Sequence, residues 1–166
     1  MQIRSQWIFD SEPQHIWPNF LQARMDDSRP LLFYFGIPKP VSCKVLEGEG
    51  ALGKTRQCTT DRGTIDQRIV IFEENRRLRY RMIASTVWCR NWVGRLEDEF
   101  TLTQLEDGRT KVERLTEFGA AGWFWPVRQI GLWVALAQAH RYAARNWRRL
   151  SEIRKQAASS DGEQVA

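Results

Sequence analysis

The side chains with the clearest potential for chemistry are a carboxylate, a guanidinium and an imidazole, those of Asp98, Arg114 and His140. Asp98 and Arg114 belong to two segments, 96–104 and 110–118, in which apolar and polar residues alternate as they do in paired strands. A carboxylate and a guanidinium bind each other or orient a polar ligand, and an imidazole exchanges protons near neutral pH. The three groups predict a polar centre for ligand binding or acid–base catalysis.

The turn between these two segments fixes which residues face each other. If Glu106-Asp107-Gly108 form a three-residue loop with Gly108 in the left-handed conformation, Leu105 pairs with Arg109. Counting back gives four further pairs: Leu102–Val112, Phe100–Arg114, Asp98–Thr116 and Leu96–Phe118. One side of the hairpin is then apolar except for Asp98, Arg114 and Thr116. The opposite side is expected to face solvent, because it carries Glu97, Glu99, Lys111, Glu113 and Glu117.

Burying Asp98 and Arg114 costs on the order of several kcal/mol per ion unless the charges are paired and further hydrogen-bonded. Two interpretations stay open: a satisfied pair that fixes the strand register, or a site that orients a ligand. His140 is likewise either a core residue or an acid–base group. The candidate ligand contacts are Tyr80, Asp98, Phe100, Arg114, Thr116, Trp133, Leu136 and His140, of which Asp98 and His140 are also the candidate catalytic residues.

A long amphipathic helix, predicted over 126–155, must position His140 against this hairpin. Apolar residues recur along it in steps of three and four, which places them on one face. That face contains Trp133, Leu136, His140, Ala143, Trp147 and Leu150, and the remaining circumference is rich in arginine. The helix therefore needs a large apolar partner surface.

The rest of the chain supplies a sheet for that partner. Alternation also predicts strands over 64–72 and 78–83, and further strands are expected over 1–9, 41–46 and 55–60. One or two short helices follow the first strand, around Pro13, and the apolar segment 31–37 is bracketed by prolines. The fold class is α+β, with one antiparallel sheet gripping one helix.

Size and composition fit one globular domain over 1–156, followed by a small polar tail, 157–166, that we expect to be disordered. The chain has 166 residues, of which 42% are hydrophobic, and it contains eight Trp and eight Phe. Residues 1–9 lack the apolar core of a secretory signal, which favours a cytoplasmic location. The apolar stretch 119–137 is interrupted by Pro126, Arg128 and Gln129, so it does not predict a membrane span. The three cysteines, Cys43, Cys58 and Cys89, are odd in number and lack CxxC spacing, which favours reduced thiols over a disulfide or a zinc site.

The net charge of +5 comes largely from arginines on the final helix. Such a stripe is more often a solvated helix face than a nucleic-acid site, so nucleic acid is not favoured as a partner. Trp123-Phe124-Trp125 just before the helix allows a peripheral contact with a membrane, or else it anchors the helix to the sheet.

One motif points elsewhere. Residues 48–55, GEGALGKT, match the phosphate-loop pattern letter for letter. That loop requires a helix beginning at its Lys-Thr pair, whereas here a short strand and the turn at Asp61-Arg62-Gly63 follow. The motif is therefore interpreted as a glycine-rich hairpin turn, and no cofactor or metal is predicted.

Several local features carry a resemblance to a known superfamily. They include Trp7-Ile8-Phe9 with Ser11-Glu12-Pro13, the segment Gly36 to Val41, Gly53 with Arg56, Arg77-Leu78, Asp107 to Thr110, and the helix with His140. In this order the chain resembles the START-like helix-grip superfamily, SRPBCC, which includes polyketide cyclase/dehydrase and lipid-transport proteins. The resemblance implies a curved antiparallel sheet of about seven strands wrapped around the long C-terminal helix, with short N-terminal helices.

The resemblance also implies a hydrophobic cavity between sheet and helix. The expected function is binding or transport of a small hydrophobic molecule, lipid- or polyketide-like, whose polar group meets Arg114. The alternative is a cyclase/dehydrase-type enzyme that uses Asp98 or His140 on an apolar substrate. The oligomeric state is left open.

Overall fold

The computed structural model describes residues 1–163, with side chains through 158. Its first half contains β1 (Gln2–Phe9), α1 (Pro13–Ile16), α2 (Pro18–Leu21), β2 (Ala23–Arg24), the 3-10 helix η1 (Leu31–Phe35), β3 (Pro40–Val45) and β4 (Thr55–Thr60). Its second half contains β5 (Gly63–Glu73), β6 (Arg77–Ser85), the 3-10 helix η2 (Arg90–Trp92), β7 (Val93–Gln104), β8 (Thr110–Ala120) and α3 (Trp125–Glu163).

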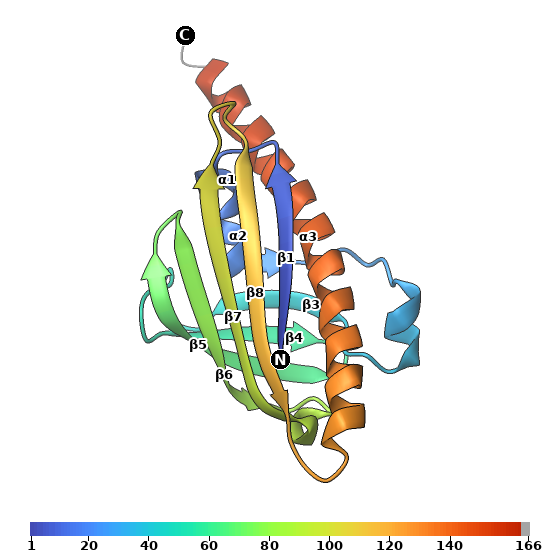
Figure 1. Cartoon of the computed structure of the whole chain (residues 1–166). Helices are drawn as coiled ribbons and strands as arrows, with labels where there is room; N and C mark the ends of the chain where they lie inside the picture. Colours follow the sequence, from blue (N-terminus) through green and yellow to red (C-terminus); the bar gives the residue numbers. More distant parts are fainter. Residues whose placement is uncertain (164–166) are drawn as a thin grey trace.

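The strands form one antiparallel sheet in the order β1-β8-β7-β6-β5-β4-β3-β2. The sheet curls strongly, so that β3 and β4 run across the direction of β7 and β8, and α3 lies along its concave side (Figure 1). The predicted α+β helix-grip architecture is confirmed. The sheet has eight strands rather than about seven because Ala23 and Arg24 pair with Cys43 and Ser42, a strand too short to show any alternation in the sequence.

The predicted register of the β7–β8 hairpin is confirmed pair by pair. Gly108 has a φ of 79°, and the Leu105 amide donates to the Arg109 carbonyl at 2.8 Å. Phe100 faces Arg114 and Asp98 faces Thr116. Turn chemistry at one glycine therefore decided which side chains of both strands point toward the helix.

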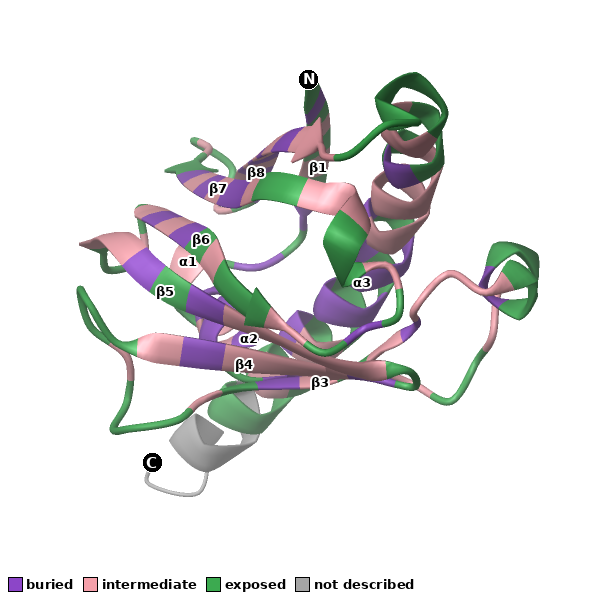
Figure 2. Cartoon of the chain, turned by 90° about the horizontal axis from the view of Figure 1, so that it is seen from below, coloured by how far each residue is buried: buried purple, intermediate pink, exposed green. Residues whose placement is uncertain are grey.

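The protected side of the hairpin packs on α3 through aromatic rings. The Phe20 ring from α2 stacks on Phe100 with centroids 4.6 Å apart, and Trp147 from α3 meets both rings edge-on, at 5.1 and 5.5 Å. Buried positions alternate with less buried ones along β8, and exposed positions recur along α3 (Figure 2). These rings close one end of the space between sheet and helix.

The outer side of the hairpin differs from the prediction at one residue. Glu97 is only 4% exposed because Arg79, Arg81 and Arg95 surround it, with shortest N–O distances of 2.7, 2.9 and 3.2 Å. Burial opposes its charge, but hydrogen bonds from the arginines hold the pKa of Glu97 below its usual value. The cross-strand ladder of arginine and glutamate covers this side of the sheet.

The final helix is longer than predicted. It continues past Lys155 to Glu163, since residues 156–161 contain no glycine or proline and include good helix formers. The expected disordered tail, 157–166, therefore begins inside helix, and its last three residues, 164–166, lie outside the described residues. No helix in the described part of the chain is long and apolar enough to cross a membrane.

The glycine-rich motif forms the turn between β3 and β4, as predicted. Gly48, Gly50 and Gly53 have positive φ values of 71°, 109° and 84°. The Gly53 amide donates to the Ile69 carbonyl at 2.8 Å, which ties the turn to β5. Because a strand follows the motif, the arrangement of amides that a phosphate loop requires does not form.

Candidate functional site

A cavity of about 180 Å³ lies between the sheet and α3. Ala135, Ala139 and Ala143 line it from the helix at steps of four residues, so three small side chains face the sheet along one strip. From the sheet and the preceding loop, its apolar lining includes Ile37, Pro38, Ile65, Met82, Val87 and Leu96. The cavity exists because alanine, rather than a larger residue, occupies those helix positions.

Asp98 and Arg114 both line the cavity and form the predicted ion pair. Nε and Nη2 of Arg114 lie 3.0 and 2.9 Å from Oδ1 of Asp98. Burial opposes the charge of Asp98, but the Arg114 guanidinium and a hydrogen bond from Thr116 hold the pKa of that carboxyl below its usual value. The contacts from Arg114 and Thr116 all end on Oδ1 of Asp98. Because the pKa of Asp98 is lowered, the ion pair is charged at neutral pH.

His140 lies behind this pair rather than in the cavity. Its Nε2 is 2.7 Å from the Thr116 hydroxyl, and its Nδ1 is 2.8 Å from the Ser5 hydroxyl. Because Thr116 donates its one proton to Asp98, it accepts from Nε2–H, which leaves Nδ1 to accept from Ser5. Burial, followed by the charge of Arg114, lowers the pKa of His140 to about 3. The imidazole is neutral and its two nitrogens are satisfied.

The other predicted contacts divide into two groups. Tyr80, Phe100 and Leu136 line the cavity, whereas Thr116 and Trp133 are not among its lining residues. Trp133 is 45% exposed, so the predicted apolar face of the helix is not fully covered at this end. The Tyr80 hydroxyl donates to the Phe20 carbonyl, and burial raises its pKa, so the phenol stays protonated.

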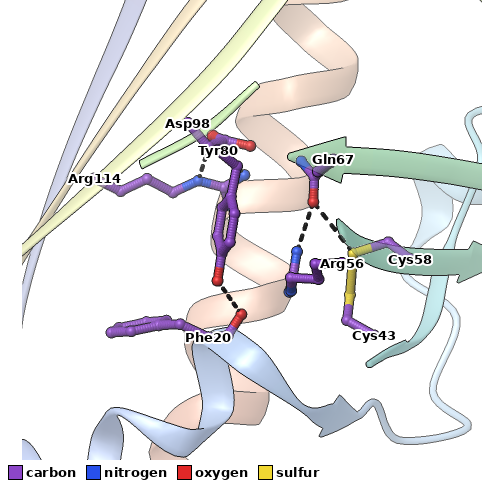
Figure 3. The surroundings of a disulfide bond; sticks show 8 residues. All are labelled: Phe20, Cys43, Arg56, Cys58, Gln67, Tyr80, Asp98 and Arg114. Carbon is purple, nitrogen blue, oxygen red and sulfur yellow. Dashed lines mark hydrogen bonds and ion pairs between the residues drawn. A yellow bond between two sulfur atoms is a disulfide. The ribbon is translucent and has the colours of Figure 1, made fainter. Parts of the chain in front are cut away.

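Sequence reasoning missed Arg56, which is 5% exposed and lines the cavity from β4. Its Nη1 donates to Oε1 of Gln67 at 2.6 Å, and its guanidinium carbon lies 4.7 Å from the centre of the Tyr80 ring (Figure 3). Its Nε has no hydrogen-bond partner, and no carboxylate in the described part of the chain forms an ion pair with it. Burial lowers its pKa.

A signal for Arg56 was present in the sequence. Arg56, Cys58 and Thr60 occupy alternate positions of one short strand, and all three line the cavity. The sequence analysis predicted this short strand but did not assign its alternate positions to the cavity.

The expectation of three reduced thiols is wrong for two of them. Cys43 and Cys58 are directly opposite in the β3–β4 register and form a disulfide, while Cys89 is free (Figure 3). An odd total of cysteines says nothing about which pair a sheet register brings together, and that was the flaw in the reasoning. Cys58 Sγ lies 3.5 Å from Oε1 of Gln67, so the disulfide packs against the side chain that holds Arg56. Disulfides persist in oxidising compartments, so the cysteines no longer support the predicted cytoplasmic location.

The charges around the cavity do not cancel. Arg56 and Arg114 are cations and Asp98 is an anion, while His140 is neutral, which leaves one excess positive charge in an apolar surrounding. No group of His, Cys, Asp and Glu side chains within the described residues is arranged to hold a metal ion.

Comparison with known proteins identifies the fold. No protein-family model matches the sequence, and no relative with a curated description matches it. Among solved structures, the chain is similar to the Zhui aromatase/cyclase from Streptomyces sp. R1128, with a TM-score of 0.69 at 14% identity over 95% of this chain and 97% of that one. It is also similar to Ara h 8.0201, with a TM-score of 0.60 at 14% identity over 91% and 97% of the two chains.

A third likeness is to a norcoclaurine synthase point mutant from Thalictrum flavum, solved in complex with a transition-state analogue. The TM-score is 0.56 at 12% identity, over 93% of this chain and 96% of that one. Sequence identities this low show the fold alone, so the activity has to be argued from the residues of the site. The curled sheet, the long helix and these likenesses show that the chain has the helix-grip fold.

Proposed function

We propose that the protein binds a small apolar molecule in the cavity between the sheet and α3. The observation that carries this proposal is the alanine strip of α3, because three small side chains four residues apart on the inward side of a helix leave room that larger residues would fill. Empty apolar space costs stability in proportion to its volume, so a cavity kept beside a well-packed aromatic cluster favours a guest.

The size of the cavity limits the guest. An apolar cavity of about 150 Å³ holds benzene, whereas pockets for drug-sized molecules measure roughly 300–1,000 Å³. The 180 Å³ available here suits a molecule of about one or two rings. A long lipid or a folded polyketide chain would require the helix and sheet to separate.

Native mass spectrometry of freshly purified protein tests the proposal. We expect a fraction of the protein to carry a bound apolar molecule that is released on denaturation and identified by its mass. A preparation with the mass of the chain alone, which then fails to bind any member of a panel of one- and two-ring compounds, would contradict it.

An enzyme of the cyclase/dehydrase kind is the alternative. It requires a cavity group that gains or loses a proton near neutral pH. Asp98 is held ionised by Arg114, the Tyr80 phenol is held protonated, and His140 is neutral and lies behind the cavity. These fixed protonation states favour ligand binding over acid–base catalysis. Turnover of a bound compound that Asp98→Asn abolishes, without weakening its affinity, would favour the enzyme instead.

A second candidate function is contact with an anionic membrane surface. Trp123, Phe124 and Trp125 are 89%, 63% and 59% exposed, and Val127 and Ile130 extend the same apolar patch. Along α3 the patch is followed by Leu132 and Leu136, which line the cavity, so the guest would enter or leave near this end of the helix. Aromatic side chains next to a basic helix are suited to the interface of an anionic bilayer.

Sedimentation with vesicles of phosphatidylcholine and phosphatidylserine tests this second candidate. We expect binding that weakens with salt and falls several-fold in Trp123→Ala/Trp125→Ala, whereas Ile153→Ala, an exposed apolar site elsewhere on α3, leaves it unchanged. Equal sedimentation of all three proteins would argue against it.

A further inference from the structure

We propose that the guest of the cavity carries an anionic group, a carboxylate in the simplest case, and that Arg56 is the residue that binds it. This inference rests on the proposed function, since it specifies the chemistry of the molecule that occupies the same cavity. Its basis is a buried cation without a counter-ion.

The fold does not satisfy Arg56. A guanidinium offers five N–H donors, and within the described residues Arg56 uses one of them, on Gln67. Its Nε is buried without a partner. A buried ion that lacks an opposite charge destabilises a protein, and an apolar side chain of similar length would avoid that cost. A stable core therefore gives no reason for arginine at this position, whereas a charged guest does.

The neighbouring polar groups cannot take the place of such a guest. Asp98 is bound by Arg114 and Thr116, and the Tyr80 hydroxyl is bound to the Phe20 carbonyl. Gln67 is neutral and already accepts from Arg56. Asp98 offsets part of the charge of Arg56, whereas Arg114 opposes it. Because Asp98 is already paired with Arg114, the three groups keep one excess positive charge, which favours an anion beside Arg56.

The surroundings also hold the guanidinium in place. Gln67 fixes Nη1, the centre of the Tyr80 ring lies 4.7 Å from the guanidinium carbon, and the Cys43–Cys58 disulfide packs against Gln67 (Figure 3). A planar guanidinium fixed in this way matches the two oxygens of a carboxylate. Together with the cavity volume, this indicates a compact aromatic or alicyclic carboxylate of one or two rings.

Matched probes test the inference by calorimetry at pH 7. Benzoate and benzamide have nearly the same size and differ in charge, and 1-naphthoate and 1-naphthamide form the corresponding two-ring pair. We expect the carboxylates to bind at least about ten-fold more tightly than the amides, as charge-assisted hydrogen bonds in a buried site allow. In Arg56→Met we expect this preference to disappear while amide binding remains. Arg68→Met, an exposed arginine on β5, should keep it.

Thermal unfolding without ligand provides a second readout. Arg56→Met should raise Tm, because it removes an uncompensated buried charge, whereas a residue retained for structure alone would lower Tm when replaced. Arg56→Lys, which keeps the charge but not the planar fork, should retain part of the carboxylate preference.

The outcomes separate the two proposals. Equal binding of acids and amides that Arg56→Met leaves unchanged would overturn the anionic guest and keep the apolar one. Failure of all four probes to bind would overturn both. A lower Tm in Arg56→Met, with no carboxylate preference in the unaltered protein, would make Arg56 a structural residue and overturn the inference.

Discussion

At the scale of single residues, the centre of the molecule is a chain of polar groups whose protons are fixed by their partners. Arg114 binds Asp98, Asp98 accepts from Thr116, and Thr116 accepts from His140, whose far nitrogen accepts from Ser5. Each member satisfies the next, which explains how the interior tolerates three titratable side chains.

The neutral state of His140 predicts a pH dependence of stability. Its folded pKa of about 3 lies below the ordinary histidine value of 6.5, so the unfolded chain takes up the proton first as the pH falls. The contribution of neutral His140 to the unfolding free energy is complete above pH 6.5. It is lost as the pH falls from 6.5 to about 3, at roughly 1.4 kcal/mol per pH unit. Urea unfolding at pH 7.5, 6 and 5 measures it. His140→Gln should flatten the dependence, with His15→Gln as the matched control, and an unchanged slope in His140→Gln would contradict this account.

The ion pair predicts a strong asymmetry between single and double substitutions. Arg114→Met should cost about 3–5 kcal/mol of unfolding free energy, because Asp98 stays buried without its counter-ion. Adding Asp98→Asn removes the charge and keeps an acceptor for Thr116, so the double variant should recover part of the loss. Urea denaturation of the three proteins checks this. A double variant less stable than Arg114→Met would show that the pair is not the source of the cost.

The residue-scale predictions from sequence succeeded where a turn fixed geometry. The Asp98–Arg114 pair followed from Gly108, because side chains in a hairpin alternate with a period of two from a defined turn. Trp133 was misplaced because a helical pattern gives relative positions on the helix and not where the sheet ends. Arg56 was missed as a site residue because alternation over so short a strand shows which residues share a face, but not that this face lines a cavity.

At the scale of elements, α3 and the β3–β4 hairpin form opposite walls of the cavity. Spacing predicted the inner face of α3, and alternation predicted most strands. These patterns did not predict β2, because two residues are too few to show alternation. They also did not predict the last turns of α3, because small and polar residues there are typical of a disordered tail as well as of a helix. The pairing of Cys43 with Cys58 needed the register of two strands joined by an irregular glycine turn.

The disulfide gives a prediction at this scale. Cys43 and Cys58 are separated by 15 residues, and closing a loop of that length stabilises a protein by about 3 kcal/mol. Cys43→Ala/Cys58→Ala should lose about that amount of unfolding free energy in urea, and dithiothreitol should have a similar effect on the unaltered protein. Cys89→Ala serves as the control. Three reactive thiols in the folded, untreated protein would show that the disulfide does not form.

At the scale of the whole molecule, a curled sheet closes around one helix and leaves space where the helix carries alanine. Aromatic rings from α2, β7 and α3 close the cavity at one end, and the exposed patch around Trp123 lies beside it near the start of α3. The cavity therefore combines a buried cation, Arg56, with an apolar lining.

The most direct test of this account is to fill the cavity. Ala139→Phe should fold, and it should abolish the saturable amide shifts at Leu136 and Phe100 that we expect when ¹⁵N-labelled protein is titrated with benzyl alcohol. Arg145→Phe, on the exposed side of the same helix, should leave those shifts intact. Shifts that persist in Ala139→Phe, or that never arise at cavity residues in the unaltered protein, would contradict the claim that this space is a binding site.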